Sequence, residues 1–178
     1  MAAGFAIIGL SSILLATQAA DPTPIDDLGG ITSTVLMSGC VGLLARGQTL
    51  SYTFEGSRIV RVQRPEGLPI GDEQVEVWQA PSPKGRIYIY ASKDNASTCY
   101  VSVFDASVEE VAPAVRRFLT LPDSPLSEGP IQQVEATGAA QIIYTSNRAS
   151  WPVVISLIAN SGADSSVPSI QLAVQRIQ

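Results

Sequence analysis

The chain has 178 residues, of which 46% are hydrophobic and 15% are charged, and its formal net charge is −5. This length favours a single domain with a real hydrophobic core, and the apolar content is too high for a disordered chain. The complete absence of histidine excludes Ser-His-Asp and Cys-His catalysis and most catalytic zinc sites. The acidic balance argues against a nucleic-acid partner, because phosphate contacts need clustered cations.

The first residues have the pattern of an export signal. Residues 2–20 carry no charge, hold an apolar stretch at 5–16 and end in small residues. This predicts a signal peptide, residues 1–19, cleaved after Ala19, although no Lys or Arg precedes the apolar run. An uncleaved membrane anchor and a buried first helix are the alternatives. We expect the mature chain to be periplasmic or extracellular, with no other membrane segment.

A flexible lead-in and a helix are predicted next. Residues 20–27 are polar and contain two prolines, which is typical of a loose tail. Residues 28–46 place apolar side chains at helical spacing, and Gly47 is a common helix stop. The glycines inside this segment lower its intrinsic helix propensity.

The spacing of apolar residues then changes to two, which predicts strands. We expect them at residues 50–55, 59–62, 74–79, 86–91 and 98–104, with a loop at 64–72. Ser107 and Glu110 form a capping box that opens a second helix, within which Pro113 should cause a kink or a later start. After a loop at 121–130, further strands are expected at 131–136, 140–145, 151–159 and 169–177.

These elements predict an α+β fold, with one or more antiparallel meander sheets and two helices packed on one face. We expect one domain over residues 28–178. The order of helix, strands, helix and strands suggests two helix-plus-meander halves, 28–104 and 105–178, although no repeat is visible residue by residue.

The two cysteines, Cys40 and Cys99, predict one disulfide, because an even pair in an exported chain is usually bonded. Cys99 shares a strand face with Val101 and Val103, so its sulfur should point into the core, where a helix packed on the sheet would present Cys40. The two do not form a CxxC redox pair, and no other residues complete a zinc site. We expect no metal and no cofactor.

Two groups of side chains are candidate binding features. Tyr88 and Tyr90 share a strand face that Trp78 of the neighbouring strand could also occupy, as a partner-binding face or as one side of an ordinary core. The second group would gather at one sheet edge, for an acidic ligand or as protection against edge-to-edge pairing. Its members are Arg58, Arg61, Arg64 and Arg86.

Carboxylate pairs are the remaining route to catalysis, because a glycosidase needs two acids facing one bond. One candidate group is Asp72, Glu73 and Glu76, at a junction of loop and strand. The other is Glu109 and Glu110, in the first turn of a helix, where the helix dipole alone favours acids. The simpler interpretation of both groups is a solvated surface.

The sequence carries no motif of a known family, and it does not identify an activity. We expect a non-catalytic exported protein that binds another protein or a cell-envelope component. The alternatives are a carboxylate enzyme acting on glycan and a structural accessory domain. An exposed face with Trp78, Tyr88 and Tyr90 would favour the first hypothesis, and a cleft holding two acids would favour the enzyme.

Overall fold

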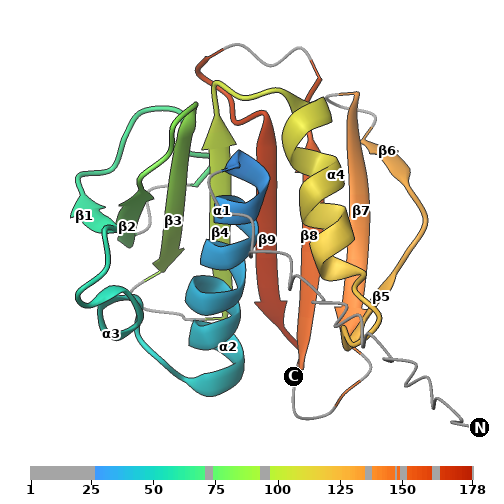
Figure 1. The fold of residues 1–178 in the computed structure, drawn as a ribbon, viewed down its shortest axis with the longest axis horizontal. Coiled ribbons are helices and arrows are strands. Elements are labelled where there is room, and N and C mark those ends of the chain that lie inside the picture. The colour runs from blue at the N-terminus through green and yellow to red at the C-terminus, as the bar shows by residue number, and fades with distance from the viewer. Residues whose placement is uncertain are drawn as a thin grey trace, which may run out of the picture.

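The computed structural model describes residues 27–70, 74–92, 97–134, 138–146, 148, 152–161 and 165–177. The predicted signal peptide and most of the predicted lead-in lie outside the described residues. Figure 1 shows one antiparallel sheet with two long helices lying across the same face. The predicted α+β fold class is confirmed.

The first helix is continuous and is built from three segments. They are α1 (Leu28–Val35), the π-helical η1 (Leu36–Val41) and α2 (Gly42–Arg46). The Asp27 side chain accepts a hydrogen bond from the Gly30 N–H at the start of the helix. Gly47 ends it with a φ of 67°, a conformation that glycine adopts without steric cost. The predicted helix over 28–46 is therefore confirmed.

By length and mean hydropathy, this helix could cross a membrane, and it is the one such helix among the described residues. Its existence corrects the expectation that no second apolar stretch is long enough to do so. In the fold, however, 61% of the most apolar 18-residue stretch of this helix is buried. Leu36 and Val41 are part of the core that it forms with the sheet.

The predicted strand at 50–55 is wrong, because the chain forms a short helix there, α3 (Leu50–Phe54). The Thr49 hydroxyl caps this helix by accepting a hydrogen bond from the Tyr52 N–H at 3.1 Å. Leu50 and Phe54 are buried, whereas Tyr52 is 68% exposed. Residues four apart share a face in both a helix and a strand, so the alternating pattern fitted either structure.

In the described residues the sheet has nine strands, all paired antiparallel. The first four are β1 (Val60–Val62), β2 (Val75–Ala80), β3 (Arg86–Ser92) and β4 (Thr98–Phe104). The others are β5 (Leu126–Glu128), β6 (Gln132–Val134), β7 (Ala139–Ser146), β8 (Val153–Ala159) and β9 (Ile170–Arg176). Their order across the sheet is β1-β2-β3-β4-β9-β8-β7-β5, and β6 also pairs with β7.

Two three-stranded meanders meet in the middle of this sheet. One is β2-β3-β4, the other is β7-β8-β9, and β4 pairs with β9 (Figure 1). Strand β5 lies inside the segment 121–130, which the sequence predicted to be entirely loop. The prolines and serines of this segment favoured a loop. The strand depends instead on backbone pairing with β7, which is distant in the sequence. An internal duplication remains a prediction.

Helix α4 (Val108–Leu119) connects the two meanders and contains Pro113 in its interior. Ser107 occupies the N-cap position as predicted, but no side-chain cap hydrogen bond forms. Its hydroxyl instead donates to the Glu109 carboxylate at 2.7 Å, and Glu110 lies 3.8 Å from the Lys84 amine. The predicted capping box is therefore replaced by two contacts outside the helix backbone.

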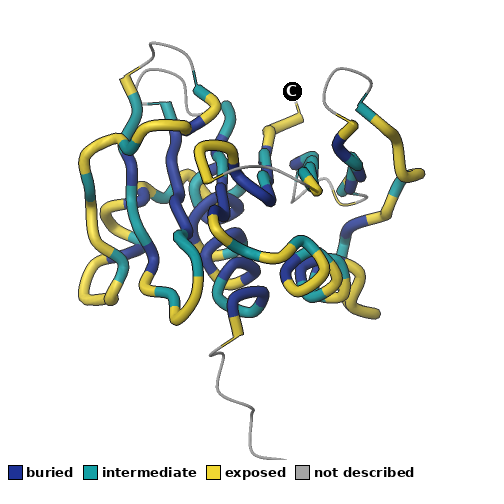
Figure 2. The backbone as a smooth tube through the Cα atoms, turned by 90° about the horizontal axis from the view of Figure 1, so that it is seen from above, coloured by how far each residue is buried: buried dark blue, intermediate teal, exposed yellow. Residues whose placement is uncertain are grey.

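The main core lies between the sheet and the helices, and Figure 2 shows the buried stretches concentrated there. The predicted disulfide is confirmed: Cys40 in η1 and Cys99 in β4 are bonded, with Cα atoms 5.2 Å apart and no side-chain exposure. Helices α1 and α4 touch closely, because a methyl group on Gly29 would lie 2.3 Å from the Ala114 Cβ.

A smaller core lies on the opposite face of the sheet. The loop after β1 places Leu68 there, against side chains from β2, β3 and β4. The other buried members of this cluster are Val77, Tyr88, Tyr90 and Phe104. This loop therefore covers part of the face that the helices leave open.

Candidate functional site

The structure does not bring the three predicted aromatic residues together. Trp78 pairs in register with Ile89, so it points to the helix-covered face, where its ring centroid lies 5.6 Å from that of Phe54. Tyr88 and Tyr90 alternate with Ile89 and point to the other face, with exposed fractions of 6% and 0%. These three side chains do not form one exposed surface.

The buried tyrosine Tyr90 is held within the smaller core. Its hydroxyl lies 2.8 Å from the Ser102 hydroxyl, and its ring stacks on Tyr100 with centroids 5.1 Å apart. Burial raises the pKa of Tyr90 to about 12. Such a group stays neutral at physiological pH, and its contacts are those of a packed core.

The four predicted arginines have different surroundings. Arg61 lies on β1, 3.6 Å from the Glu76 carboxylate, and Arg64 donates to the Ile70 carbonyl. Arg86 lies on β3, where its Nε is 2.6 Å from an Asp105 carboxylate oxygen. This hydrogen bond raises the pKa of Arg86 above its ordinary value. The fourth, Arg58, precedes β1 and is part of a different site.

The candidate acids are not gathered into a cleft in the part of the chain that the structure describes. Glu76 is engaged by Arg61 and by the Ser51 hydroxyl, which donates to it at 3.2 Å. Glu109 and Glu110 are exposed in the first turn of α4. Asp72 and Glu73 lie outside the described residues. Among the described residues, no group of three potential metal ligands occurs.

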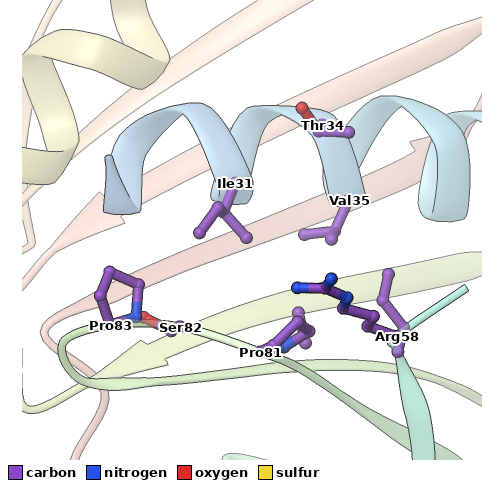
Figure 3. Close-up of a pocket in the computed structure, with 9 residues that line it drawn as sticks. Ile31, Thr34, Val35, Arg58, Pro81, Ser82 and Pro83 are labelled. Carbon is purple, nitrogen blue, oxygen red and sulfur yellow. The ribbon is translucent and has the colours of Figure 1, made fainter. Parts of the chain in front are cut away.

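A groove with a volume of about 620 Å³ lies between α1 and the turn that joins β2 to β3 (Figure 3). Ile31, Thr34 and Val35 of α1 form one wall. Pro81, Ser82 and Pro83 lie opposite, and Arg58 lies at one end. Ile59 and Ala80 complete the lining. Six of the nine lining residues are apolar: Ile31, Val35, Ile59, Ala80, Pro81 and Pro83.

The local sequence explains why this groove is open. Ile31 and Val35 are four residues apart, so they lie on the same side of α1. Strand β2 ends at Ala80, and the prolines at 81 and 83 lack the N–H that would continue a strand ladder. Gly85, with a φ of 67°, then turns the chain back into β3. The turn thus stands opposite α1 and leaves apolar surface between them.

Arg58 is the one charged residue among the nine that line the groove. Its guanidinium extends into the groove in Figure 3. It makes no hydrogen bond or ion pair with the residues that the structure describes, unlike Arg61 and Arg86. The groove therefore combines apolar walls with one positive charge that pairs with no acid in the part of the chain that the structure describes.

Both hydroxyl groups in the lining are already engaged within the chain. The Thr34 hydroxyl donates to the Gly30 carbonyl at 2.9 Å, and the Ser82 hydroxyl donates to the Lys84 carbonyl. Among the described lining residues, neither has a carboxylate or an amine that could act as a general base. The arrangement can bind a molecule, but it does not present an activated nucleophile.

A second cavity of about 300 Å³ lies near the C-terminal end of α4. Met37 of η1, Phe118 and Leu119 contribute to it, together with residues 121–126. Its one charged lining residue is Asp123. It is half the volume of the groove and contains no cation, so it does not share the groove's chemistry.

No protein-family model, curated protein sequence or solved structure matches this chain at a significant level. The candidate site is therefore defined by its own geometry. Sequence reasoning did not identify it, because its two walls are almost fifty residues apart in the chain. The available signals were the pair of apolar residues four apart at 31 and 35 and the two prolines at 81 and 83, but neither indicates that the walls face each other.

Proposed function

We propose that this protein is an exported, non-catalytic binding protein that holds the apolar part of another molecule in the groove between α1 and the β2–β3 turn. The observation that carries the proposal is the groove itself. Its volume of about 620 Å³ and its mainly apolar walls are typical of sites that bury a ligand.

Two further features support this proposal. The Cys40–Cys99 disulfide fits an exported chain, because such bonds are rare in proteins kept in a reducing cytosol. The engaged hydroxyls of Thr34 and Ser82 favour binding over catalysis, and so does the absence of acids from the lining residues that the structure describes. A periplasmic or extracellular location would give the groove access to envelope components.

The test is to fill the groove from one wall. Thr34 is exposed on α1 and lines the groove, so we expect Thr34→Trp to occupy its volume. Binding of the neutral apolar dye N-phenyl-1-naphthylamine to the full, disulfide-bonded chain would be followed by fluorescence. We expect the wild type to bind the dye and Thr34→Trp to bind it roughly tenfold more weakly.

The matched control is Ser38→Trp, one turn further along the same helix. Ser38 is also exposed, and its hydroxyl also donates to the carbonyl four residues before it, but it does not line the groove. It should bind the dye as the wild type does, and thermal melts would show that both variants are folded. A wild type that does not bind the dye, or a Thr34→Trp variant that binds it normally, would contradict the proposal.

A further inference from the structure

We infer that the ligand of this groove is an amphiphile with one terminal carboxylate, whose apolar chain lies along α1 and whose carboxylate pairs with Arg58. The inference rests on the proposed function, because it specifies the ligand of the same groove. Three observations carry it: a cation, Arg58, that pairs with no acid among the described residues, the direction of the groove, and the two wall hydroxyls, which already donate within the chain.

The cation is the first. Arg61 and Arg86 each face a carboxylate, whereas Arg58 faces none among the described residues. No acid is among the described residues that line the groove, although the chain as a whole has a net charge of −5. A guanidinium presents a planar fork of N–H donors that matches the two oxygens of a carboxylate. One cation fits a monoanion, whereas phosphate sites usually combine several cations.

The direction of the groove is the second. Ile31 and Val35 are separated by about 6 Å of helix rise, so the apolar wall runs along the helix axis. In Figure 3, Pro83 faces Ile31 at one end, and Arg58 lies near Val35 at the other. A ligand with its charge at Arg58 would therefore place its apolar chain against Ile31 and the proline turn.

The wall chemistry is the third, and it favours an amphiphile over a peptide. A bound peptide backbone needs partners for its own N–H and C=O groups. Pro81 and Pro83 have no N–H to offer, and the hydroxyls of Thr34 and Ser82 already donate within the chain. An alkyl chain has no hydrogen-bonding groups that need partners.

The experiment compares amphiphiles with the same ten-carbon chain: decanoate, decanol and decyltrimethylammonium. Each would be titrated into the full, disulfide-bonded protein by calorimetry at neutral pH, for the wild type, Arg58→Gln and Arg61→Gln. We expect the wild type to bind decanoate roughly tenfold more tightly than decanol, and the ammonium compound most weakly. Arg58→Gln should lose this preference while still binding decanol. Arg61→Gln, which removes a neighbouring exposed arginine outside the groove, should keep it.

The outcomes separate this inference from the proposed function. Equal binding of decanoate and decanol by the wild type, or an unchanged preference in Arg58→Gln, would overturn the carboxylate inference and leave the groove as a binding site. Tighter binding of a tri-leucine peptide than of decanoate would overturn it in favour of a peptide. If neither the neutral dye nor any amphiphile binds, the proposed function fails as well.

Discussion

At the scale of single residues, an ion pair joins α4 to β5. The Arg116 Nη2 lies 2.6 Å from a Glu128 carboxylate oxygen. The hydrogen bond from Arg116 lowers the pKa of Glu128 below its ordinary value of 4.5. Tyr144 is buried beside this pair, and burial raises the pKa of its hydroxyl. The Arg116–Glu128 ion pair therefore links the short strand β5 to helix α4.

This pairing predicts a pH-dependent contribution to stability. A carboxyl group whose pKa is lowered by folding stabilises the fold above its ordinary pKa, and the stabilisation is lost as the pH falls through the lowered value. We expect Glu128→Gln to unfold more easily than the wild type at about pH 7, by about 0.5–1 kcal/mol, since both side chains are partly exposed. Urea titrations of both proteins would show the difference shrinking towards about pH 3. A difference that is independent of pH would contradict this account.

At the scale of elements, the sequence predicted those with long, regular patterns. The helix over 28–46 and the strands carrying Val77, Ile89 and Val101 have clear periods and fold as expected. The segment at 50–55 was mispredicted because six residues are too few to separate a period of two from a helical turn. The Thr49 side chain caps and stabilises the helix at this segment. A threonine at the N-cap position was the local sequence signal for a helix.

The contact between α1 and α4 gives a prediction at this scale. A methyl group on Gly29 would lie 2.3 Å from the Ala114 Cβ, so Gly29→Ala should force the helices apart and lower the unfolding free energy by about 1–3 kcal/mol. Gly42→Ala is the matched control in the same continuous helix. Its added methyl would lie 3.0 Å from the flexible end of Gln48 and 4.0 Å from the Met37 carbonyl oxygen. The higher helix propensity of alanine should offset these contacts. Equal stability of the two variants in urea titrations would rule out a close helix contact.

At the scale of the whole molecule, fold class and disulfide could be predicted, but the candidate site could not. Alternation fixes which side of a strand faces the core, so Cys99 could be matched with Cys40. The strand register, by contrast, depends on long-range pairing. It places Trp78 on the opposite face of the sheet from Tyr88 and Tyr90. The groove depends on where α1 crosses the sheet relative to the β2–β3 turn, which no local pattern encodes.

The disulfide should contribute strongly to global stability. It links residues 59 apart, and closing a loop of this size restricts the unfolded chain by about 4 kcal/mol on the chain-entropy model. We expect the double variant Cys40→Ala/Cys99→Ala to have a free energy of unfolding, measured by urea titration, that is lower by about 4 kcal/mol. Intact mass spectrometry with alkylation, before and after reduction, would first establish the bond in the purified protein. Two thiols that react without reduction would refute it.

The position of β9 has a consequence for how the chain is made. Its partner in the first meander, β4, is complete some seventy residues before β9 is synthesised, so one long side of β4 has no neighbour during that interval. Both cysteines are already synthesised by then, but the first meander keeps this open edge until β9 emerges. Nascent chains stalled before residue 170 should therefore be the species most prone to self-association and most in need of a chaperone.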